Sequence, residues 1–293
     1  MSPLVTVYLP TRNRVTLLQQ AAESVLTQTC ADFELLIVDD GSDDATPELL
    51  EALARRDPRV RLFRHDRPLG PQRARNLALQ HARGRFLTGL DDDDLMLPQR
   101  LESLLEVEPE KYALVCSSFW LDKAGRRSRM NRLARAITLD KLLHYNIVGN
   151  QALMVTERVR EIGGFDETML ASQDYDLWLR LVHRFGSGRR ISDPTYVVRT
   201  GLITDTITRS PRFAEGAKQF TAKHAILMSP AHLRSQRLVQ LVTAHAPLTL
   251  KDFGTTFSRG AALLWLKYWV SRTLLYRCLN KFMSNSMRLH NQA

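Results

Sequence analysis

The chain has 293 residues, of which 44% are hydrophobic and 25% are charged. This length and composition allow one large domain, or a domain with an appendage, and exclude collagen-like, low-complexity and wholly disordered chains. The net charge of +10 comes from the end of the sequence, because residues 1–210 hold 29 basic and 29 acidic side chains whereas residues 211–293 hold 12 and 2. We therefore expect a neutral first part with a cationic extension, which would be attracted to anionic lipid or nucleic acid.

The three cysteines, Cys30, Cys116 and Cys278, stand far apart and form no CxxC pair. Neither a disulfide framework nor a thiolate zinc site is therefore expected. The first residues lack the basic start and the apolar length of a secretory leader. No stretch approaches the roughly 20 mostly apolar residues that a bilayer-spanning helix needs. These features together favour a reducing, cytoplasmic location.

The first ninety residues alternate short apolar runs with helical periods, which is the pattern of a parallel α/β sheet. The predicted strands are residues 5–9, 33–38, 59–64 and 85–90. The predicted helices between them are residues 14–28, 47–56 and 72–82. Each strand is thus joined to the next by a helical crossover.

After residue 90 the pattern changes to α+β. It predicts a helix at 98–106, a hairpin of 112–121 with 126 onward around Lys123-Ala124-Gly125, a strand at 149–155 and a helix at 172–185. From about Asp205 the composition becomes polar and basic with helical periods. We therefore predict a catalytic or binding domain over residues 1–205 and a helical, basic region over residues 206–293.

Polar side chains follow each of the first four predicted strands. They are Pro10-Thr11-Arg12-Asn13, Asp39-Asp40-Gly41-Ser42, Gly70 to Asn76, and Asp91-Asp92-Asp93-Asp94. Ligands of open α/β sheets bind outside the carboxyl ends of the strands. We therefore expect these four groups to meet at one edge of the sheet and to form a binding site there.

The four consecutive carboxylates of Asp91 to Asp94 repel one another unless a cation or hydrogen-bond donors compensate them. Magnesium and manganese prefer such hard oxygen ligands, and they complete their shell with phosphate oxygens and water. The tetrad therefore predicts a divalent metal site. The alternative is an acidic loop that caps the helix beginning near Pro98.

Asp39 and Asp40 end an apolar strand and in this respect resemble a Walker B element. No GxxxxGK[ST] loop and no GxGxxG fingerprint occurs in the chain, which argues against a P-loop NTPase and a nicotinamide-dependent enzyme. A carboxylate at this position can accept hydrogen bonds from a nucleobase or ribose. The alternative is an ordinary turn residue.

In this order and spacing the motifs resemble those of the family 2 glycosyltransferases, over roughly residues 4–185. The motifs that carry the resemblance are Val7 to Asn13, Ile37 to Ser42, Gly70 to Asn76, Leu90 to Asp94, Gly163-Gly164-Phe165-Asp166 and Gln173-Asp174. The resemblance implies the GT-A fold, a Rossmann-like, mostly parallel sheet flanked by helices. It also implies an inverting mechanism, a nucleoside diphosphate sugar donor, with a UDP-sugar favoured, and Mn²⁺ or Mg²⁺ as cofactor.

The resemblance also implies which residues form the donor site. The residues it assigns to binding of the nucleotide sugar are Pro10, Asn13, Asp40, Arg75, Asp91 and Asp92. Among these, Pro10 and Asp40 would lie against the base, and Asp91 would contact the ribose. Asp93 would hold the metal ion that bridges the diphosphate.

Asp174 occupies the position of the family's general base. The family usually has Glu-Asp there, and this chain has Gln173-Asp174, which leaves the base in place. The predicted helix 172–185 begins beside it, and the helix dipole would favour an ionised carboxylate near neutral pH. The alternative is that Asp174 or Ser172 merely caps this helix. The eight histidines show no metal-ligand spacing and receive no role.

The end of the chain predicts an amphipathic helix with a largely apolar, aromatic face. That face carries Trp265, Tyr268, Trp269, Leu275, Tyr276, Leu279, Phe282 and Met283, although Arg272 intrudes on it. Lys267, Arg277 and Lys281 lie on the opposite face. Such a helix suits an anionic bilayer surface, with Trp265, Trp269 and Phe282 inserted. A helix packed on the catalytic domain has the same pattern and remains an equal alternative.

The sequence thus predicts an inverting, metal-dependent glycosyltransferase that transfers a sugar to a hydroxyl of a glycan or lipid-linked acceptor in bacterial surface polysaccharide synthesis. We expect it to be cytoplasmic or peripheral on the cytoplasmic membrane face. One alternative is a nucleotidyltransferase, although the glycine-rich basic loop of that class is missing. Another is an anionic-polymer-binding protein, but the aromatic residues of the tail are not interleaved with basic ones for base stacking. We therefore expect no nucleic-acid partner.

Overall fold

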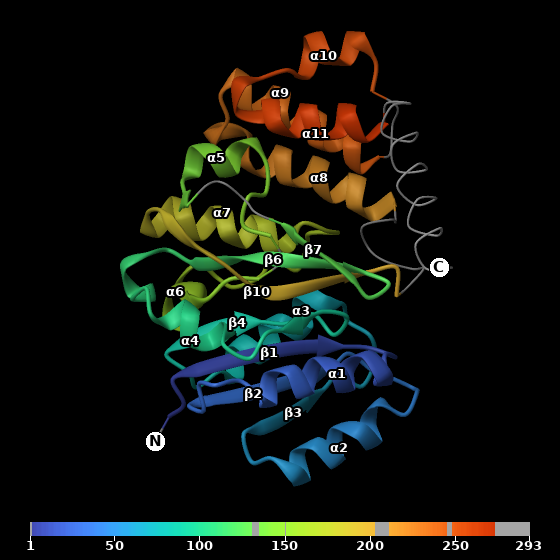
Figure 1. Cartoon of the computed structure of the whole chain (residues 1–293), viewed down its shortest axis with the longest axis vertical. Helices are drawn as coiled ribbons and strands as arrows, with labels where there is room; N and C mark the ends of the chain where they lie inside the picture. Colours follow the sequence, from blue (N-terminus) through green and yellow to red (C-terminus); the bar gives the residue numbers. More distant parts are fainter. Residues whose placement is uncertain (1, 131–134, 150, 203–210, 245–247, 273–293) are drawn as a thin grey trace, which may run out of the picture. The chain divides into compact units, whose positions relative to one another are not determined.

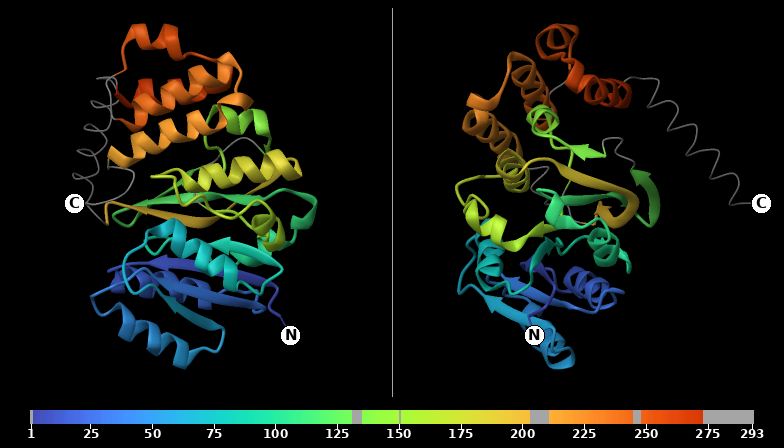
Figure 2. Two further views of the ribbon diagram at one scale, coloured as in Figure 1. Left: turned by 180° about the vertical axis from the view of Figure 1, so that it is seen from behind. Right: turned by 90° about the vertical axis from the view of Figure 1, so that its left-hand side faces the viewer.

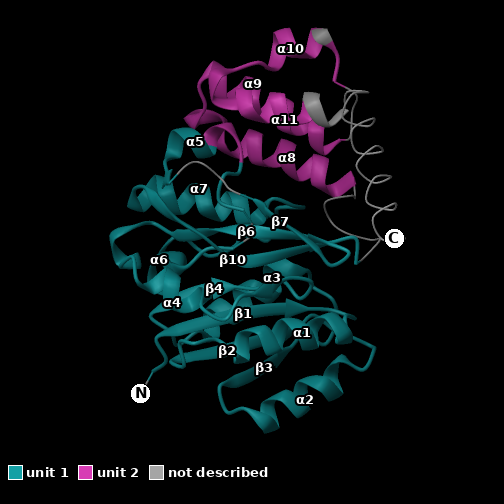
Figure 3. Ribbon diagram, viewed as in Figure 1, with its two compact units in different colours: residues 1–142, 146–206 teal, residues 143–145, 207–293 magenta. Residues whose placement is uncertain are grey.

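The computed structural model describes residues 2–130, 135–149, 151–202, 211–244 and 248–272 (Figure 1). The chain divides into two compact units (Figure 3). The first unit comprises residues 1–142 and 146–206, and the second comprises residues 143–145 and 207–293. Among the described residues, no helix combines the length and the apolar character that crossing a membrane requires.

The first unit is built on a five-stranded sheet with the order β3-β2-β1-β4-β9. Its strands are β1 (Val5–Thr11), β2 (Phe33–Asp39), β3 (Val60–Arg64), β4 (Phe86–Gly89) and β9 (Met154–Val155). The first four are mutually parallel, and β9 runs antiparallel to β4. Strands β1 and β2 are almost entirely buried, as expected for a parallel sheet that is covered on both faces.

Three helices connect the parallel strands: α1 (Val15–Leu26), α2 (Thr46–Arg56) and α3 (Pro71–His81). Helix α3 lies on the opposite face of the sheet from α1 (Figure 2). The buried residues of α1, Leu18, Ala21, Ala22 and Val25, recur every three or four positions and form one apolar face. They pack into the same core as Val5, Val7 and Leu9 of β1.

A second sheet completes the first unit, with β5 (Leu95–Met96), β10 (Gly188–Thr200), β6 (Val115–Lys123) and β7 (Arg126–Met130) in that order. Strand β8 (Ala136–Ile137) pairs with β10 as well. The remaining helices of this unit are α4 (Arg100–Leu105), α5 (Leu139–His144, whose last two residues belong to the second unit), α6 (Thr156–Glu161) and α7 (Gln173–Phe185). The class predicted from the sequence, α/β with a mostly parallel sheet flanked by helices, is confirmed.

Several predicted elements differ from the structure. The strand predicted at 149–155 is only Met154–Val155, and the helix predicted at 98–106 begins at Arg100. The long strand β10 was not predicted, because its polar sequence contains Pro194, where its pairing with β6 shifts register. The hairpin of β6 and β7 is present, and both turn residues, Ala124 and Gly125, have positive φ.

The second unit consists of helices α8 (Pro211–His224), α9 (Pro230–Thr243), α10 (Leu250–Thr256) and α11 (Ala262–Arg272). Helix α9 begins with a capping box in which Ser229 and His232 bond to each other's backbone N–H groups. Trp265 of α11 is buried against Leu238 and Ala261, and its indole N–H donates to Thr256 Oγ1 at 2.8 Å. Trp265 is therefore packed inside the protein and is not available for the membrane insertion that was one of its two predicted roles. The other members of the predicted aromatic face beyond residue 272 lie outside the described residues.

Candidate active site

The carboxyl ends of the parallel strands bring the four predicted polar groups to one edge of the first sheet. Thr11 at the end of β1 pairs with Asp39 at the end of β2, and the backbone N–H of Asp40 donates to Thr11 O at 2.9 Å. On the other side of β1, the N–H of Leu90 donates to Tyr8 O at 3.0 Å. The strand order reverses between β1 and β4, which is where open α/β sheets bind their ligands.

Asp40 is buried and holds the loop between β3 and α3. Its Oδ1 accepts from Leu69 N at 2.8 Å and lies 2.8 Å from His65 Nδ1, and its Oδ2 accepts from Gly70 N at 2.8 Å. Gly70, with a φ of +100°, occupies the N-cap of α3. The carboxylate of Asp40 therefore fixes the start of the helix that carries Arg75.

Pro10 and Asn13 lie at the end of β1 and just beyond it. Pro10 is half-buried and pairs with Val38 of β2. Asn13 has a φ of +53°, and its side chain exchanges two hydrogen bonds with Asp43, at 2.7 and 2.9 Å. Its backbone N–H donates to Ser42 Oγ at 2.9 Å. Asn13 therefore joins the loop after β1 to the loop after β2.

Two members of the aspartate tetrad are occupied by the protein itself. Asp92 is buried and accepts from Thr11 Oγ1 at 2.8 Å and from Arg14 Nη1 at 2.7 Å. Asp94 is also buried, and its Oδ1 accepts from the backbone N–H of Arg199 at 3.0 Å. The N-cap of α4 is Gln99, and no side chain caps that helix. The alternative interpretation, in which the acidic loop caps the helix near Pro98, is therefore wrong.

The other two members, Asp91 and Asp93, keep 23% and 26% of their side chains exposed. Burial, together with the charges of Asp91 and Asp92, raises the pKa of Asp93 to about 6. The nearby cation, Arg14 Nη1, lies 3.6 Å from Asp93 and is already bonded to Asp92. Repelling carboxylates of this kind form a donor set that suits a hard divalent cation.

Arg75 lies between Asp91 and Asp174. It is 5% exposed, and its Nη2 donates to Asp91 Oδ1 at 2.8 Å while its Nε lies 3.9 Å from Asp174 Oδ1. Both acidic neighbours raise the pKa of Arg75 against the effect of burial, so it stays cationic. Its Nε and Nη1 have no hydrogen-bond partner among the described residues. The guanidinium therefore links the tetrad to the predicted general base.

Asp174 lies in the first turn of α7, and its Oδ1 has no hydrogen-bond partner within the described part of the chain. Ser172 occupies the N-cap but its side chain makes no capping bond, so the capping interpretation of Ser172 is wrong. Burial raises the pKa of Asp174 to about 6, while Arg75 opposes the shift and Asp91 adds to it. Burial thus outweighs the helix dipole, which the sequence had suggested would favour the charged form. At neutral pH the carboxylate remains mostly ionised.

Two neighbours of this cluster were missed by the sequence interpretation. The Tyr8 hydroxyl, buried within β1, donates to Gln151 Oε1 at 3.0 Å, and Gln151 Nε2 lies 3.3 Å from Asp91 Oδ1. Tyr8 sits in the middle of an apolar strand, and Gln151 precedes a strand of two residues, so neither stands in a motif. The sequence did offer one indication for Tyr8, because a hydroxyl within an apolar strand needs a hydrogen-bond partner in the protein interior.

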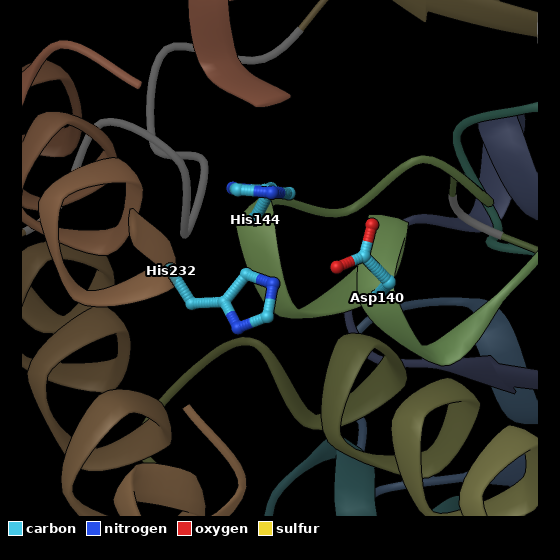
Figure 4. A group of neighbouring side chains, drawn as sticks. All are labelled: Asp140, His144 and His232. Carbon is cyan, nitrogen blue, oxygen red and sulfur yellow. The ribbon is translucent and has the colours of Figure 1, made fainter. Parts of the chain in front are cut away.

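A separate group, Asp140, His144 and His232, places potential metal ligand atoms within 4.8 Å of one another (Figure 4). Asp140 and His144 are four residues apart on α5, so they lie one turn apart. This pair was not identified from the sequence as possible metal ligands. The rings of His144 and His232 pack edge to face with centroids 4.4 Å apart. His144 Nδ1 lies 2.7 Å from Ser235 Oγ, and His232 Nδ1 accepts from Ser229 N at 3.1 Å. These contacts use both rings in packing the second unit.

Comparison with known proteins decides between the remaining function classes. Residues 6–168 match the sequence model described as Glycosyl transferase family 2. This chain belongs to that family, and it is therefore a glycosyltransferase. The protein named "Putative colanic acid biosynthesis glycosyl transferase WcaA" of Escherichia coli K12 is 32% identical over 232 residues, which are 76% of this chain and 82% of that protein.

Solved structures agree on the fold of this glycosyltransferase. Staphylococcus aureus TarS 1–349 in complex with UDP-GlcNAc superposes with a TM-score of 0.66 at 18% identity, covering 90% of this chain and 78% of that one. The mannosyltransferase PcManGT of Pyrobaculum calidifontis, in complex with GDP-Man and Mn²⁺, gives a TM-score of 0.59 at 21% identity, covering 97% and 85%. These likenesses establish the GT-A type of fold for this chain.

Proposed function

We propose that this protein is an inverting, metal-dependent glycosyltransferase that transfers a sugar from a nucleoside diphosphate sugar to a hydroxyl of a glycan or lipid-linked acceptor. The observation that carries the proposal is the convergence of Asp91, Asp93, Arg75 and Asp174 at the carboxyl ends of the parallel strands. One side of this cluster offers carboxylates for a metal ion. The other offers Oδ1 of Asp174, which has no hydrogen-bond partner among the described residues.

The donor is assigned to the edge formed by the loops after β1, β2 and β4. The nucleotide base lies beside Pro10, Asn13 and Asp40, and Asp40 acts mainly by ordering the loop at Leu69 and Gly70. Asp91 faces the ribose, and Arg75 supports Asp91 from behind. Asp92, bonded to Thr11 and Arg14, fixes the tetrad on the sheet rather than contacting the donor directly. A UDP-sugar is the favoured donor, in line with the complex of TarS with UDP-GlcNAc.

The metal ion is assigned to Asp93, with Asp91 beside it. Mn²⁺ or Mg²⁺ suits these carboxylates, and the complex of PcManGT contains Mn²⁺. When bound, the ion supplies charge neutralisation for the diphosphate leaving group. The raised pKa of Asp93 supports this assignment, because Arg14 only partly offsets the burial of Asp93 and the negative charges of Asp91 and Asp92.

Asp174 is proposed as the general base. Its Oδ1 takes the proton of the acceptor hydroxyl while the hydroxyl oxygen attacks the anomeric carbon. The bond from that carbon to the diphosphate oxygen breaks, and the nucleoside diphosphate leaves with the electron pair. Attack from the side opposite the leaving group inverts the anomeric configuration. Arg75, 3.9 Å from Asp174, keeps the pKa of this buried carboxylate from rising further.

We also propose that the enzyme acts in bacterial surface polysaccharide synthesis, as the name of its E. coli relative suggests, and is peripheral on the cytoplasmic membrane face. Residues 211–293 carry 12 basic and two acidic side chains, which favours contact with anionic lipid. Leu263 and Leu266 of α11 are 62% and 56% exposed and could enter a headgroup layer. Trp265 is excluded from that role because it is buried.

The test of the proposed function is a thermal-shift panel of nucleoside diphosphates and nucleotide sugars, each with Mn²⁺ and with EDTA. A ligand that binds the native state alone raises the melting temperature by mass action. We expect at least one nucleotide sugar to do so with Mn²⁺, and matched nucleoside triphosphates to give no larger shift. Stabilisation by triphosphates alone would favour a nucleotidyltransferase instead.

A further inference from the structure

Gln151 connects the aspartate tetrad to the interior of the first sheet. It lies shortly before β9 and is 5% exposed, and its Nε2 donates to Asp91 Oδ1 at 3.3 Å. On its other side, its Oε1 accepts from the hydroxyl of Tyr8 at 3.0 Å. The amide therefore bridges a buried strand residue and the carboxylate that the proposed function places at the ribose.

The direction of these two hydrogen bonds is set by the groups at their ends. A carboxylate can only accept, so the nitrogen of Gln151 faces Asp91 and its oxygen faces Tyr8. The Tyr8 hydroxyl must then donate, and burial raises the pKa of Tyr8 well above its ordinary value, so the hydroxyl keeps its proton. Tyr8 thus holds the amide in the orientation that presents a donor to Asp91.

The contact between Gln151 and Tyr8 is made over a glycine. Tyr8 of β1 pairs with Gly89 of β4. A Cβ added at Gly89 would lie 2.3 Å from both the Tyr8 ring and Gln151 Oε1, so any side chain there would displace the pair. The ring and the amide therefore fill the space that a side chain of β4 would otherwise take.

Asp91 receives two donors on the same oxygen. Arg75 Nη2 donates to Oδ1 at 2.8 Å, and Gln151 Nε2 reaches the same atom. The torsion that turns an aspartate carboxylate is broad, so hydrogen bonds rather than rotamer preference set its orientation. The side chain of Asp91 is 23% exposed, and Oδ2 accepts no hydrogen bond from the described residues. The two donors thus engage Oδ1 and leave Oδ2 to accept from a ligand.

Gln151 supplies its hydrogen bond without adding a charge. Arg75 already places one cation beside Asp91. A second cation would reduce the negative charge that attracts a metal ion to Asp93. A neutral amide orients the carboxylate and leaves that negative charge unchanged, which suits a residue that supports a metal and nucleotide site.

We propose that Gln151 is a positioning residue for the donor: held by Tyr8, it fixes Asp91 so that Oδ2 accepts a hydrogen bond from a ribose hydroxyl of the nucleotide. This inference rests on the proposed function, since it takes Asp91 to face the ribose. Gln151 acts through Asp91 and need not touch the donor itself. Loss of the amide should therefore weaken the recognition of one ribose hydroxyl rather than nucleotide binding as a whole.

The experiment measures how well the full-length protein distinguishes a nucleotide from analogues that lack one ribose hydroxyl. The probes are UDP, 2′-deoxy-UDP and 3′-deoxy-UDP, titrated calorimetrically in Mn²⁺, with the GDP series in their place if GDP is the nucleotide that binds. A ratio of affinities is the readout, because a general loosening of the site weakens nucleotide and analogue alike and leaves the ratio unchanged.

The variants are Gln151→Met alone and Gln151→Met combined with Tyr8→Phe. The double variant leaves no hydroxyl without a partner, so it should fold even if the single variant does not. The matched control is Gln28→Met. Gln28 is 7% exposed, and its amide bonds to backbone atoms outside the donor site.

We expect the parent and Gln28→Met to bind UDP at least about tenfold more tightly than one of the deoxy analogues, the scale of a hydrogen bond to a charged group. In both Gln151 variants this ratio should fall to about threefold or less, with the affinity for that analogue close to the parent's.

The inference is overturned if a folded Gln151 variant keeps the parent's ratio, or if the parent does not distinguish UDP from either analogue. It is also overturned if neither variant folds, because Gln151 would then be a structural residue. Failure of both UDP and GDP to bind the parent would instead overturn the proposed function, and the inference would fall with it.

Discussion

Asp93 is a partly exposed member of the tetrad whose ionised form is disfavoured by burial and by its acidic neighbours. Its pKa of about 6 in the folded protein lies above the value near 4 of an unfolded chain, so the folded state binds the proton more tightly. By linkage, the stability that this group contributes is present at pH values below about 4 and is lost as the pH rises through 6. At pH 7 without metal, the ionised carboxylate therefore destabilises the fold by roughly 1–3 kcal/mol.

We predict that Asp93→Asn raises the melting temperature of the metal-free protein at pH 7, since the amide removes the repulsion from Asp91 and Asp92. The same substitution should abolish the additional stabilisation that Mn²⁺ gives to the parent. Calorimetric melting in EDTA and in Mn²⁺ measures both effects. A variant that is less stable in EDTA, or that still responds to Mn²⁺, would contradict the assignment of Asp93 as a metal ligand.

Asp174 gives a second prediction at this scale. Because its pKa is raised to about 6 and the base must be ionised, kcat/KM should rise with pH and level off above about 7. Asp174→Asn should keep donor binding but lose transfer by about 100-fold or more. Steady-state rates at several pH values, with donor affinity as the control, test both points. Turnover of the variant near the parent rate would mean that Asp174 has no catalytic role.

At the scale of elements, the sequence predicted best where a single local pattern determines the structure. Strand β2 and helix α1 follow their apolar periods, and their ends fall within about two residues of the predicted ones. Strand β10 could not be predicted, because its place is set by pairing with β6, β5 and β8 rather than by its own mostly polar sequence.

Helix α11 carries both a buried aromatic side chain and exposed apolar side chains, so packing in the second unit and membrane contact can be tested with different substitutions. Trp265 is 4% exposed, whereas Leu263 and Leu266 of the same helix are 62% and 56% exposed. We predict that Trp265→Ala lowers the free energy of unfolding by about 3–5 kcal/mol and lowers the melting temperature accordingly. Leu263→Ser with Leu266→Ser should leave the melting temperature nearly unchanged but reduce sedimentation with phosphatidylglycerol vesicles. Equal vesicle binding by the double variant and the parent would exclude α11 as the membrane contact.

At the scale of the whole molecule, every residue assigned to donor binding, metal binding and proton transfer belongs to the first unit. The set was assigned through the resemblance of its motifs to those of the family 2 glycosyltransferases, and most of its members stand near the carboxyl ends of the parallel strands. The sequence did not predict which members the fold uses internally, since Asp92 and Asp94 differ from Asp91 and Asp93 only in the direction of their side chains. Tyr8 and Gln151 were missed because their contacts join positions 143 residues apart.

The central claim is that a nucleotide sugar binds at the strand ends through a metal ion held by Asp93. The direct measurement is calorimetric titration of UDP-GlcNAc, UDP-glucose and GDP-mannose into the parent and Asp93→Asn, each in Mn²⁺ and in EDTA. The account predicts that at least one of these donors binds the parent in Mn²⁺, at least about tenfold more weakly in EDTA, and that Asp93→Asn loses this metal dependence while remaining folded. Equal affinity in Mn²⁺ and EDTA, or metal-dependent binding that survives in Asp93→Asn, would contradict it.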